Sequence, residues 1–229
     1  MQGSFTGPRV FWSGSSLRTE ATGYGLVFFV QLMLAGMNKE IKGLRCAVSG
    51  SGKITMLVLE KLIGYGSLPI TVSDSKGYLV DEDGFDYMKI SFLRDIKAQK
   101  RSLRDYSKTC ARSKYYDEAK PWSVRGDVAF PCGYQNEIDQ SDAINLVNSG
   151  CRILVVAGEL ELNHECNLLN WSPEDFESKL QIYQRALKAA SDFGYQKESP
   201  EEAPYHVYMS SVFSAFLTIA QAMSDQGCV

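Results

Sequence analysis

The fold is decided by residues 43–77, GLRCAVSGSGKITMLVLEKLIGYGSLPITVSDSKG. The apolar run at 44–49 predicts a short strand, residues 53–63 predict a helix, and LPITVSD at 68–74 predicts a second strand. Glycines and serines fill the turn between the first strand and the helix. A strand, a glycine-rich turn, a helix and another strand in this order are typical of a parallel βαβ unit.

The glycine-rich turn holds Gly50, Ser51, Gly52 and Lys53 where the helix begins. In that setting, glycines let a pyrophosphate approach backbone N–H groups at the helix N-terminus. Asp74 ends the next strand about twenty residues later, where an acid meets the adenosine ribose in dinucleotide sites. We therefore interpret these five residues as candidate dinucleotide contacts. The alternative is a tight turn that binds no ligand.

Two features of this stretch bear on how the site would work. Thr55 holds the third glycine position, where Gly or Ala lets helix and strand pack closely, so we expect its branched side chain to push the helix outward. Lys53 places a cation near the phosphates, which is favourable. Asp74 favours the free 2′-hydroxyl of NAD, but Ser75 and Lys76 add a donor and a cation beside it. These residues leave NAD and NADP both open.

The rest of the chain alternates helices with short apolar runs, which indicates a doubly wound sheet of parallel strands. The further predicted elements are a helix over 19–34, a turn-rich piece at 76–84, a helix at 85–106, a strand at 127–131, a helix capped at Ser141, a strand at 151–156, and C-terminal helices at 172–193 and 211–223. Residues 42–156 should thus form a Rossmann-like α/β core, a mainly parallel sheet flanked by helices.

Composition and charge argue against several classes of protein. With 24 basic and 27 acidic side chains the formal net charge is −3, so we expect no nucleic-acid partner. The apolar run at 23–37 is shorter than the roughly 20 residues of a spanning helix, so we expect a buried helix, a soluble chain and no membrane partner. Only two histidines are present, and although His164 and Cys166 could in principle join a metal site, we expect none.

Cysteines and charge runs have simple interpretations. Six scattered cysteines, with no CxxC pair and no secretory leader, predict reduced thiols and a cytoplasmic location. Cys132 and Cys151 should be small buried side chains near strand ends, because no histidine lies close in sequence to act as a base. The basic run at 97–112 should be a solvated helix face, and the acidic residues at 81–83 a solvated turn.

Longer stretches of the sequence resemble a known family. They are SGSSLRTEATGYGLVFF at 13–29, SGSGK at 49–53, SDSKGYLVDEDGF at 73–85, DVAFPCGYQNEID at 127–139 and AFLTIAQAMSDQG at 215–227. In order and spacing they resemble the C-terminal, cofactor-binding half of NADP-type glutamate dehydrogenases in the Glu/Leu/Phe/Val dehydrogenase family, with the closest likeness to the plant enzymes. The resemblance implies reversible oxidative deamination of L-glutamate to 2-oxoglutarate and ammonia, with NADP favoured over NAD.

The resemblance also implies cofactor contacts, residue by residue. Phosphate, ribose and nicotinamide contacts all have counterparts in this chain. They are Thr22 of EATG at the nicotinamide end, Gly50 and Gly52 at the phosphates, Asp74, Ser75 and Lys76 of SDSKG around the adenosine ribose and 2′-phosphate, and Gln135 and Asn136 of QNE beside the nicotinamide. Lys53 stands where the family usually has Asn.

The sequence departs from the family in two places. The family's N-terminal domain binds glutamate and supplies the catalytic lysine and aspartate, and this chain starts just before SGSSLRTEATG, so no residue here is assigned a catalytic role. After GCRILV the family continues with an EG(S/A)NMP-type segment, a helix and a strand. Here Val155 runs directly into VAGELELNHE, so about one βα unit, roughly thirty residues, is expected to be missing.

These observations give one expected domain and three functional hypotheses. The domain covers 1–229, with a leading segment and helix at 1–43, a core at 44–156 and C-terminal helices at 157–229, and lacks the substrate domain. As an enzyme, the chain would need that domain to be supplied. As a non-catalytic module, it would bind a dinucleotide and associate with itself or with full-length relatives. As an unstable product of splicing or of a gene model, it would do neither.

Overall fold

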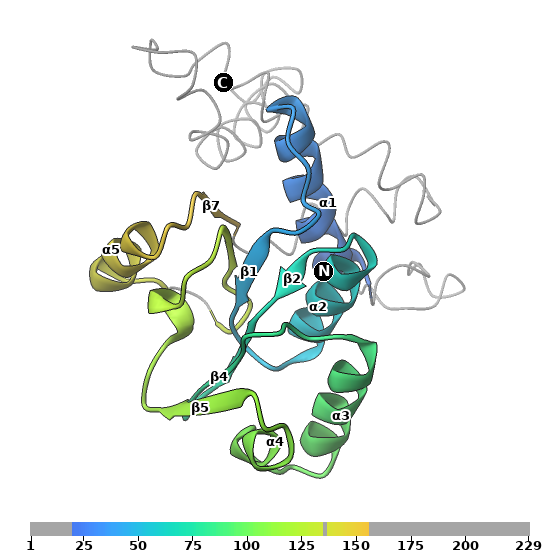
Figure 1. The fold of residues 1–229 in the computed structure, drawn as a ribbon, viewed down its shortest axis with the longest axis vertical. Helices are drawn as coiled ribbons and strands as arrows, with labels where there is room; N and C mark the ends of the chain where they lie inside the picture. Colours follow the sequence, from blue (N-terminus) through green and yellow to red (C-terminus); the bar gives the residue numbers. More distant parts are fainter. Residues whose placement is uncertain (1–19, 135–136, 156–229) are drawn as a thin grey trace, which may run out of the picture.

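In the computed structural model, the structure describes residues 20–134 and 137–155. Four strands form a parallel sheet in the order β2–β1–β6–β7 (Figure 1). Their bounds are Arg45–Val48 for β1, Leu68–Pro69 for β2, Val128–Phe130 for β6 and Ile153–Leu154 for β7. β1 pairs with both β2 and β6, and β6 pairs with β7. This parallel sheet with its helices confirms the predicted Rossmann-like α/β class.

A second sheet of three antiparallel strands follows the first βαβ unit. Its members are β3 at Thr71–Asp74, β4 at Gly77–Asp81 and β5 at Ser113–Asp117. The predicted strand at 68–74 is therefore two strands that belong to different sheets. The change occurs at Ile70, whose N–H donates to the Cys46 carbonyl while its own carbonyl accepts from the N–H of Asp81. One short apolar run thus pairs first with β1 and then with β4.

The sequence analysis missed β4 and β5. The predicted turn-rich piece at 76–84 was wrong in its centre, where β4 is buried along its whole length. Its apolar run Tyr78-Leu79-Val80 is short and lies between charged residues, so the turn signals on either side outweighed it. β5 buries only Ser113 of its five residues, so it has no apolar alternation by which a strand could be recognised.

The helices of the described residues are α1 at Ala21–Gly36, α2 at Lys53–Gly64, α3 at Tyr87–Ala98, α4 at Arg104–Thr109 and α5 at Gln140–Asn148. The predicted helix at 85–106 is divided between α3 and α4, and between them Lys100 adopts a left-handed φ of 55°. The predicted cap at Ser141 was wrong. Asp139 caps α5, because its carboxylate accepts from the N–H of Asp142 in a reciprocal capping box.

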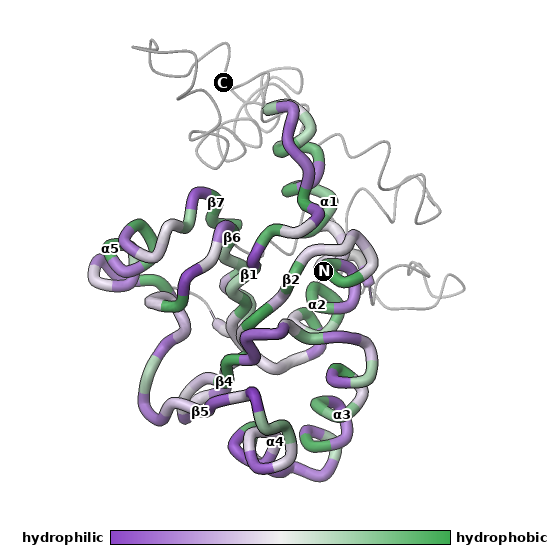
Figure 2. The backbone as a smooth tube through the Cα atoms, in the orientation of Figure 1, coloured by the Kyte–Doolittle hydropathy of each residue, from purple (hydrophilic) through white to green (hydrophobic). Residues whose placement is uncertain are grey.

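The core lies between the parallel sheet and the helices that cover it. α1 and α2 pack closely at Gly23, where a Cβ would lie only 2.5 Å from the Cβ of Leu57. Val27 and Val30 of α1 and Leu59 of α2 are fully buried in this core, and Figure 2 shows hydrophobic segments gathered on α1, α2 and β1. The apolar run at 23–37 thus forms a buried helix. Within the described residues, no helix is long and apolar enough to cross a membrane.

The acidic residues at 81–83 correct one prediction. Asp81 is buried instead of solvated: it pairs with Lys89 Nζ at 2.8 Å and accepts from the Tyr106 hydroxyl at 3.1 Å. It therefore joins the end of β4 to α3 and α4. The basic side chains of the run at 97–112 are exposed as expected, but they do not form one helix face, because the run is divided between α3, α4 and the segments outside them. The helices predicted at 172–193 and 211–223, together with His164 and Cys166, lie outside the described residues.

Candidate dinucleotide site

The turn after β1 is built around Gly50. Its φ is +79°, and a Cβ there would lie 2.7 Å from Thr55 Oγ1 and 2.8 Å from the Cys132 carbonyl oxygen. Only glycine fits this position without strain, because L-residues avoid that φ and the neighbouring carbonyl leaves no space for a side chain. Gly50 therefore forms the tight turn between β1 and α2, and the loop that follows β6 packs against this turn.

Gly52 has a different environment from Gly50. It is the N-cap of α2, is exposed, has an ordinary φ of −84°, and has no atom within 4 Å of an added Cβ. Because glycine has no side chain, Gly52 makes no capping hydrogen bond to the N–H groups of the first turn. Lys53 is exposed as the first residue of α2, and Ser51 is half-buried. A phosphate could approach the helix N-terminus closely at this point.

Thr55 is accommodated by a hydrogen bond. Its side chain is fully buried, and its hydroxyl donates to the Ser49 carbonyl at 3.1 Å. The sequence analysis expected this branched side chain to push α2 outward. That expectation considered the size of the threonine side chain but not the hydrogen bond that its hydroxyl makes to Ser49, the residue between β1 and Gly50.

The glycine turn is held against the end of β3. The Gly50 N–H donates to Ser73 Oγ at 2.8 Å, and the Ser73 N–H donates back to the Gly50 carbonyl at 3.1 Å. Two residues earlier on β3, the Thr71 hydroxyl accepts from the Val48 N–H and donates to the Val48 carbonyl. These bonds place Asp74, the next residue of β3, beside the glycine turn. The structure thus brings together the predicted phosphate and ribose residues.

Asp74 organises the turn that joins β3 to β4. Its Oδ1 accepts from the N–H of Lys76 at 2.9 Å, from the N–H of Gly77 at 3.2 Å and from the Tyr115 hydroxyl at 3.0 Å. Asp74 is half-buried, whereas Ser75 and Lys76 are exposed at the tip of the turn. Burial, together with the hydrogen bond to Asp74, raises the pKa of Tyr115 to about 12, so its hydroxyl is protonated and donates at neutral pH.

A buried hydrogen-bond bridge crosses between the ends of β1 and β6. Ser49 Oγ donates to Glu137 Oε2 at 2.8 Å and accepts from the Cys132 N–H at 3.0 Å. The same Glu137 oxygen accepts from the Gly133 N–H at 3.1 Å. The sequence analysis missed both Ser49 and Glu137, although they adjoin Gly50 and the predicted Gln135 and Asn136. Nothing local in the sequence indicates a contact between residues so far apart.

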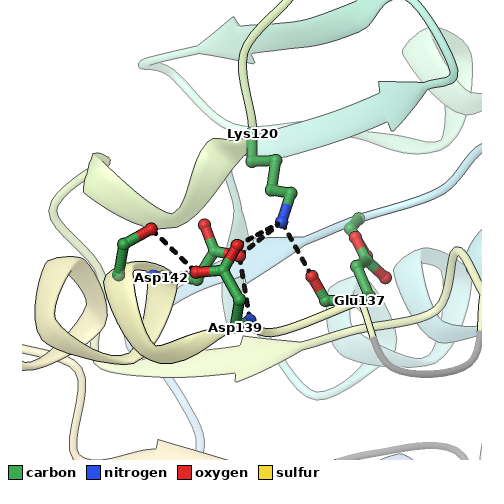
Figure 3. Close-up of polar contacts among 6 residues, drawn as sticks. Lys120, Glu137, Asp139 and Asp142 are labelled. Carbon is green, nitrogen blue, oxygen red and sulfur yellow. Dashed lines mark hydrogen bonds and ion pairs between the residues drawn. The ribbon is translucent and has the colours of Figure 1, made fainter.

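Lys120 holds the end of the loop after β6 that leads into α5 (Figure 3). Its ammonium group donates to the Glu137 carbonyl at 3.0 Å and pairs with Asp139 and Asp142, the two acids of the α5 capping box. The bond to Asp142 raises the pKa of Lys120, while the Asp142 N–H holds the pKa of Asp139 well below its usual range. The cation therefore compensates two carboxylates that would otherwise repel each other.

The nicotinamide-side predictions are only partly placed by the structure. Thr22 is buried in the first turn of α1. Its neighbour Gly23 lies against the first turn of α2, since a Cβ there would be 3.1 Å from the Ile54 carbonyl oxygen. Gln135 and Asn136 lie outside the described residues, between the exposed Tyr134 and the buried Glu137.

The cysteines of the described residues are free thiols. Burial raises the pKa of Cys132 to about 12 and also raises the pKa of Cys151, so both are protonated at neutral pH. Protonated thiols are poor nucleophiles, but both side chains are half-buried and not buried as the sequence analysis expected. In the part of the chain that the structure describes, no cluster of three metal-ligating side chains occurs.

The arrangement fits a dinucleotide better than it fits a turn without a ligand. Gly50 has no room for a side chain, yet Gly52, two residues on, opens to solvent at a helix N-terminus. The Asp74 turn follows Ser73, which is hydrogen-bonded to Gly50. A pyrophosphate at Gly52 would thus leave its adenosine ribose near Asp74, Ser75 and Lys76, in the turn that joins β3 to β4 of the antiparallel sheet.

Comparison with known proteins gives these residues a family context. The family profile for Glutamate/Leucine/Phenylalanine/Valine dehydrogenase matches residues 13–158, more than half of the chain. The chain is 40% identical over 163 residues to an NADP-specific glutamate dehydrogenase of Psychrobacter sp. (strain TAD1), covering 71% of this chain and 36% of that protein. It is 31% identical over 264 residues to the NADP-specific glutamate dehydrogenase of Giardia intestinalis, covering 99% of this chain and 58% of that protein.

Solved structures agree with the sequence comparison. Glutamate dehydrogenase 2 of Plasmodium falciparum superposes with a TM-score of 0.79 at 27% identity, covering 96% of this chain and 55% of its own. A second glutamate dehydrogenase structure from that organism has a TM-score of 0.80 at 27% identity and 54% coverage of its own chain. The chain therefore spans between 36% and 58% of the length of these relatives.

Proposed function

The chain belongs to the Glutamate/Leucine/Phenylalanine/Valine dehydrogenase family, and from this premise we propose that it is the NADP-binding part of a glutamate dehydrogenase. The parent reaction is the oxidative deamination of L-glutamate to 2-oxoglutarate and ammonia, in which NADP accepts the hydride. The observation that carries the proposal is the pair of glycines at the α2 N-terminus. Gly50 is required by the backbone, whereas Gly52 leaves an open approach to the helix dipole.

NADP is proposed as the cofactor in preference to NAD. Lys76 is exposed at the tip of the Asp74 turn, where its ammonium group could meet a 2′-phosphate. Asp74 directs one carboxylate oxygen into three hydrogen bonds within the protein. The relatives from Psychrobacter and Giardia named above are NADP-specific, which supports the same choice. Thr22, Gln135 and Asn136 are proposed to lie at the nicotinamide end.

We propose that these 229 residues bind the dinucleotide without oxidising glutamate by themselves. The buried acid beside the glycine turn, Glu137, already accepts from Ser49 and Gly133, so it is engaged in structure. Losing general acid–base catalysis typically costs about 10²–10⁴ in rate. Losing substrate positioning removes several further kcal/mol of barrier lowering. The chain would then act as a binding module that associates with itself or with full-length relatives, and its free thiols suit the cytoplasm.

A shortened core is part of the proposal. The alignment with the Giardia relative extends over 264 residues, longer than the 229 residues of this chain, so that relative carries residues with no counterpart here. We propose that roughly thirty of them, about one βα unit, belong after β7. Sequencing transcripts across Val155 and Val156 tests this, and a longer sequence in every transcript would contradict it. The closer likeness to plant enzymes remains a prediction.

The decisive experiment is a cofactor titration on the purified 229-residue chain. We expect saturable NADPH binding by fluorescence, a folded near-UV spectrum, and no glutamate-dependent reduction of NADP above a heat-treated control. Light scattering on the same sample gives its oligomeric state. No saturable binding by a folded chain would contradict the binding proposal. A steady glutamate-dependent rate, with contaminating host enzyme excluded, would instead contradict the claim that the chain does not turn over.

A further inference from the structure

Tyr115 reaches the candidate site from two strands away. It lies on β5, opposite Leu79 of β4, while Asp74 ends β3 on the other side of β4. Its hydroxyl nevertheless donates to Asp74 Oδ1 at 3.0 Å. The phenol thus spans the antiparallel sheet to contact the one acid that the sequence places at the adenosine ribose. No local pattern around Tyr115 indicated this contact.

The contact completes an unusual distribution of donors on Asp74. Three donors within the described residues, the N–H groups of Lys76 and Gly77 and the Tyr115 hydroxyl, bond to the same oxygen of this carboxylate, Oδ1. Hydrogen bonds to an ionised carboxylate are stronger than neutral ones and they delocalise part of its charge. The carboxylate is therefore oriented into its own turn and its charge is partly compensated there.

Other neighbours keep the tyrosine in place and in its donating form. The Arg104 guanidinium lies 5.5 Å from the centre of the Tyr115 ring and pairs with Asp117 on the same strand. Burial and the contact with Asp74 raise the pKa of Tyr115 to about 12, so the phenol retains its proton throughout the physiological range. The half-buried ring is thereby fixed between α4 and the Asp74 turn.

We propose that Tyr115 is a positioning residue that sets the preference of this site for NADP. By holding Oδ1 in the turn, its hydroxyl reduces the repulsion that Asp74 would exert on a 2′-phosphate, which can then be met by Lys76. An acid in this position otherwise selects the free 2′-hydroxyl of NAD. The inference rests on the proposed function, because it concerns the specificity of the same site.

Tyr115→Phe tests the proposal, because it removes the hydroxyl and keeps the ring. The dissociation constants of NADPH and NADH are measured by fluorescence on the full chain. We expect NADPH to bind about tenfold more weakly and NADH to change less than about threefold, because a less compensated Asp74 repels the 2′-phosphate that only NADPH carries. Tyr116→Phe, the neighbouring and exposed phenol on the same strand, is the matched control and should change neither constant.

Asp74→Asn gives a second test that does not depend on the folding of the Tyr115 variant. If Tyr115 and the two backbone donors already compensate the carboxylate, removing its charge should improve the NADPH-to-NADH preference by less than about threefold. An improvement of tenfold or more would overturn the proposal. So would an equal loss of both nucleotides, or no change, in folded Tyr115→Phe. If the unaltered chain bound neither nucleotide, the proposed function itself would fail.

Discussion

Three glycine-to-alanine substitutions separate the demands of the backbone from those of a ligand. Gly43 has a φ of +77° and nothing within 4 Å of an added Cβ, so alanine there adds backbone strain alone. Gly50 combines a φ of +79° with contacts of 2.7 and 2.8 Å to Thr55 and to the Cys132 carbonyl. Gly52 has neither the strained φ nor a neighbour in contact. Alanine therefore adds backbone strain at Gly43, backbone strain and overpacking at Gly50, and neither of these at Gly52.

The expected losses follow from those differences. A left-handed non-glycine residue costs about 1–2 kcal/mol, which is the loss predicted for Gly43→Ala. Overpacking against a backbone carbonyl adds about 1–3 kcal/mol, so Gly50→Ala should lose about 2–5 kcal/mol in total. That is a large share of a typical net stability of about 5–15 kcal/mol. Gly52→Ala should stay within about 1 kcal/mol, because the weaker N-cap is offset by the lower entropy of the unfolded chain.

Urea denaturation followed by circular dichroism gives the unfolding free energies, and an NADPH titration gives affinity. Gly52→Ala should fold normally but bind NADPH at least about tenfold more weakly, because its methyl group would occupy the approach to the helix N-terminus. Gly43→Ala should retain full affinity. The reasoning is refuted if Gly50→Ala loses no more stability than Gly43→Ala, or if Gly52→Ala binds NADPH as tightly as the parent chain.

Other predictions concern the charges and phenols around the site. Lys120→Met should lower the free energy of unfolding by about 1–3 kcal/mol, which is less than the loss of a fully buried ion pair because the lysine side chain is 39% exposed. Lys114→Met is the exposed control, and an equal loss of stability in that variant would contradict the prediction. Lys76→Ala should weaken the binding of NADPH more than the binding of NADH in a fluorescence titration. An equal loss of affinity for both nucleotides would contradict a contact between Lys76 and the 2′-phosphate. Burial raises the pKa values of Tyr24 and Tyr115 from 10.0 to about 12. Their contribution to the stability of the folded state is therefore complete below pH 10.0 and is lost as the pH rises toward about 12. Thermal melts across this alkaline range should show the loss, and Tyr24→Phe should reduce it.

The parallel part of the fold could be predicted because its signals are local. The strand at 44–49, the glycine turn and the helix at 53–63 lie within one stretch, and β1 and α2 follow them closely. The cap of α5 was placed two residues late because aspartate and serine are both good caps, and the reciprocal bond between Asp139 and Asp142 depends on three-dimensional geometry. Asp81 was assigned to solvent because its partners, the half-buried Lys89 and the buried Tyr106, lie later in the chain, on α3 and α4.

The candidate site shows the same division between local and distant information. Gly50, Gly52 and Asp74 were predicted from one continuous stretch, since the spacing of a βαβ unit fixes their relation. Ser49 and Glu137 are 88 residues apart, and Tyr115 and Asp74 are 41 apart, so no periodicity connects them. Yet these distant bonds add the Tyr115 hydroxyl to the donors on Asp74 and hold the loops after β1 and β6 together.

Glu137 shows how a buried acid next to the candidate site is held in place by its hydrogen bonds. A catalytic acid needs an oxygen that reaches the reacting atoms. Oε2 of Glu137 instead accepts from the Ser49 hydroxyl and the Gly133 N–H, and its backbone carbonyl accepts from Lys120. Because the residue is 6% exposed, breaking those bonds would leave a buried carboxylate without partners, which is costly. The carboxylate is therefore a bridge that joins the loop after β1 to the loop after β6.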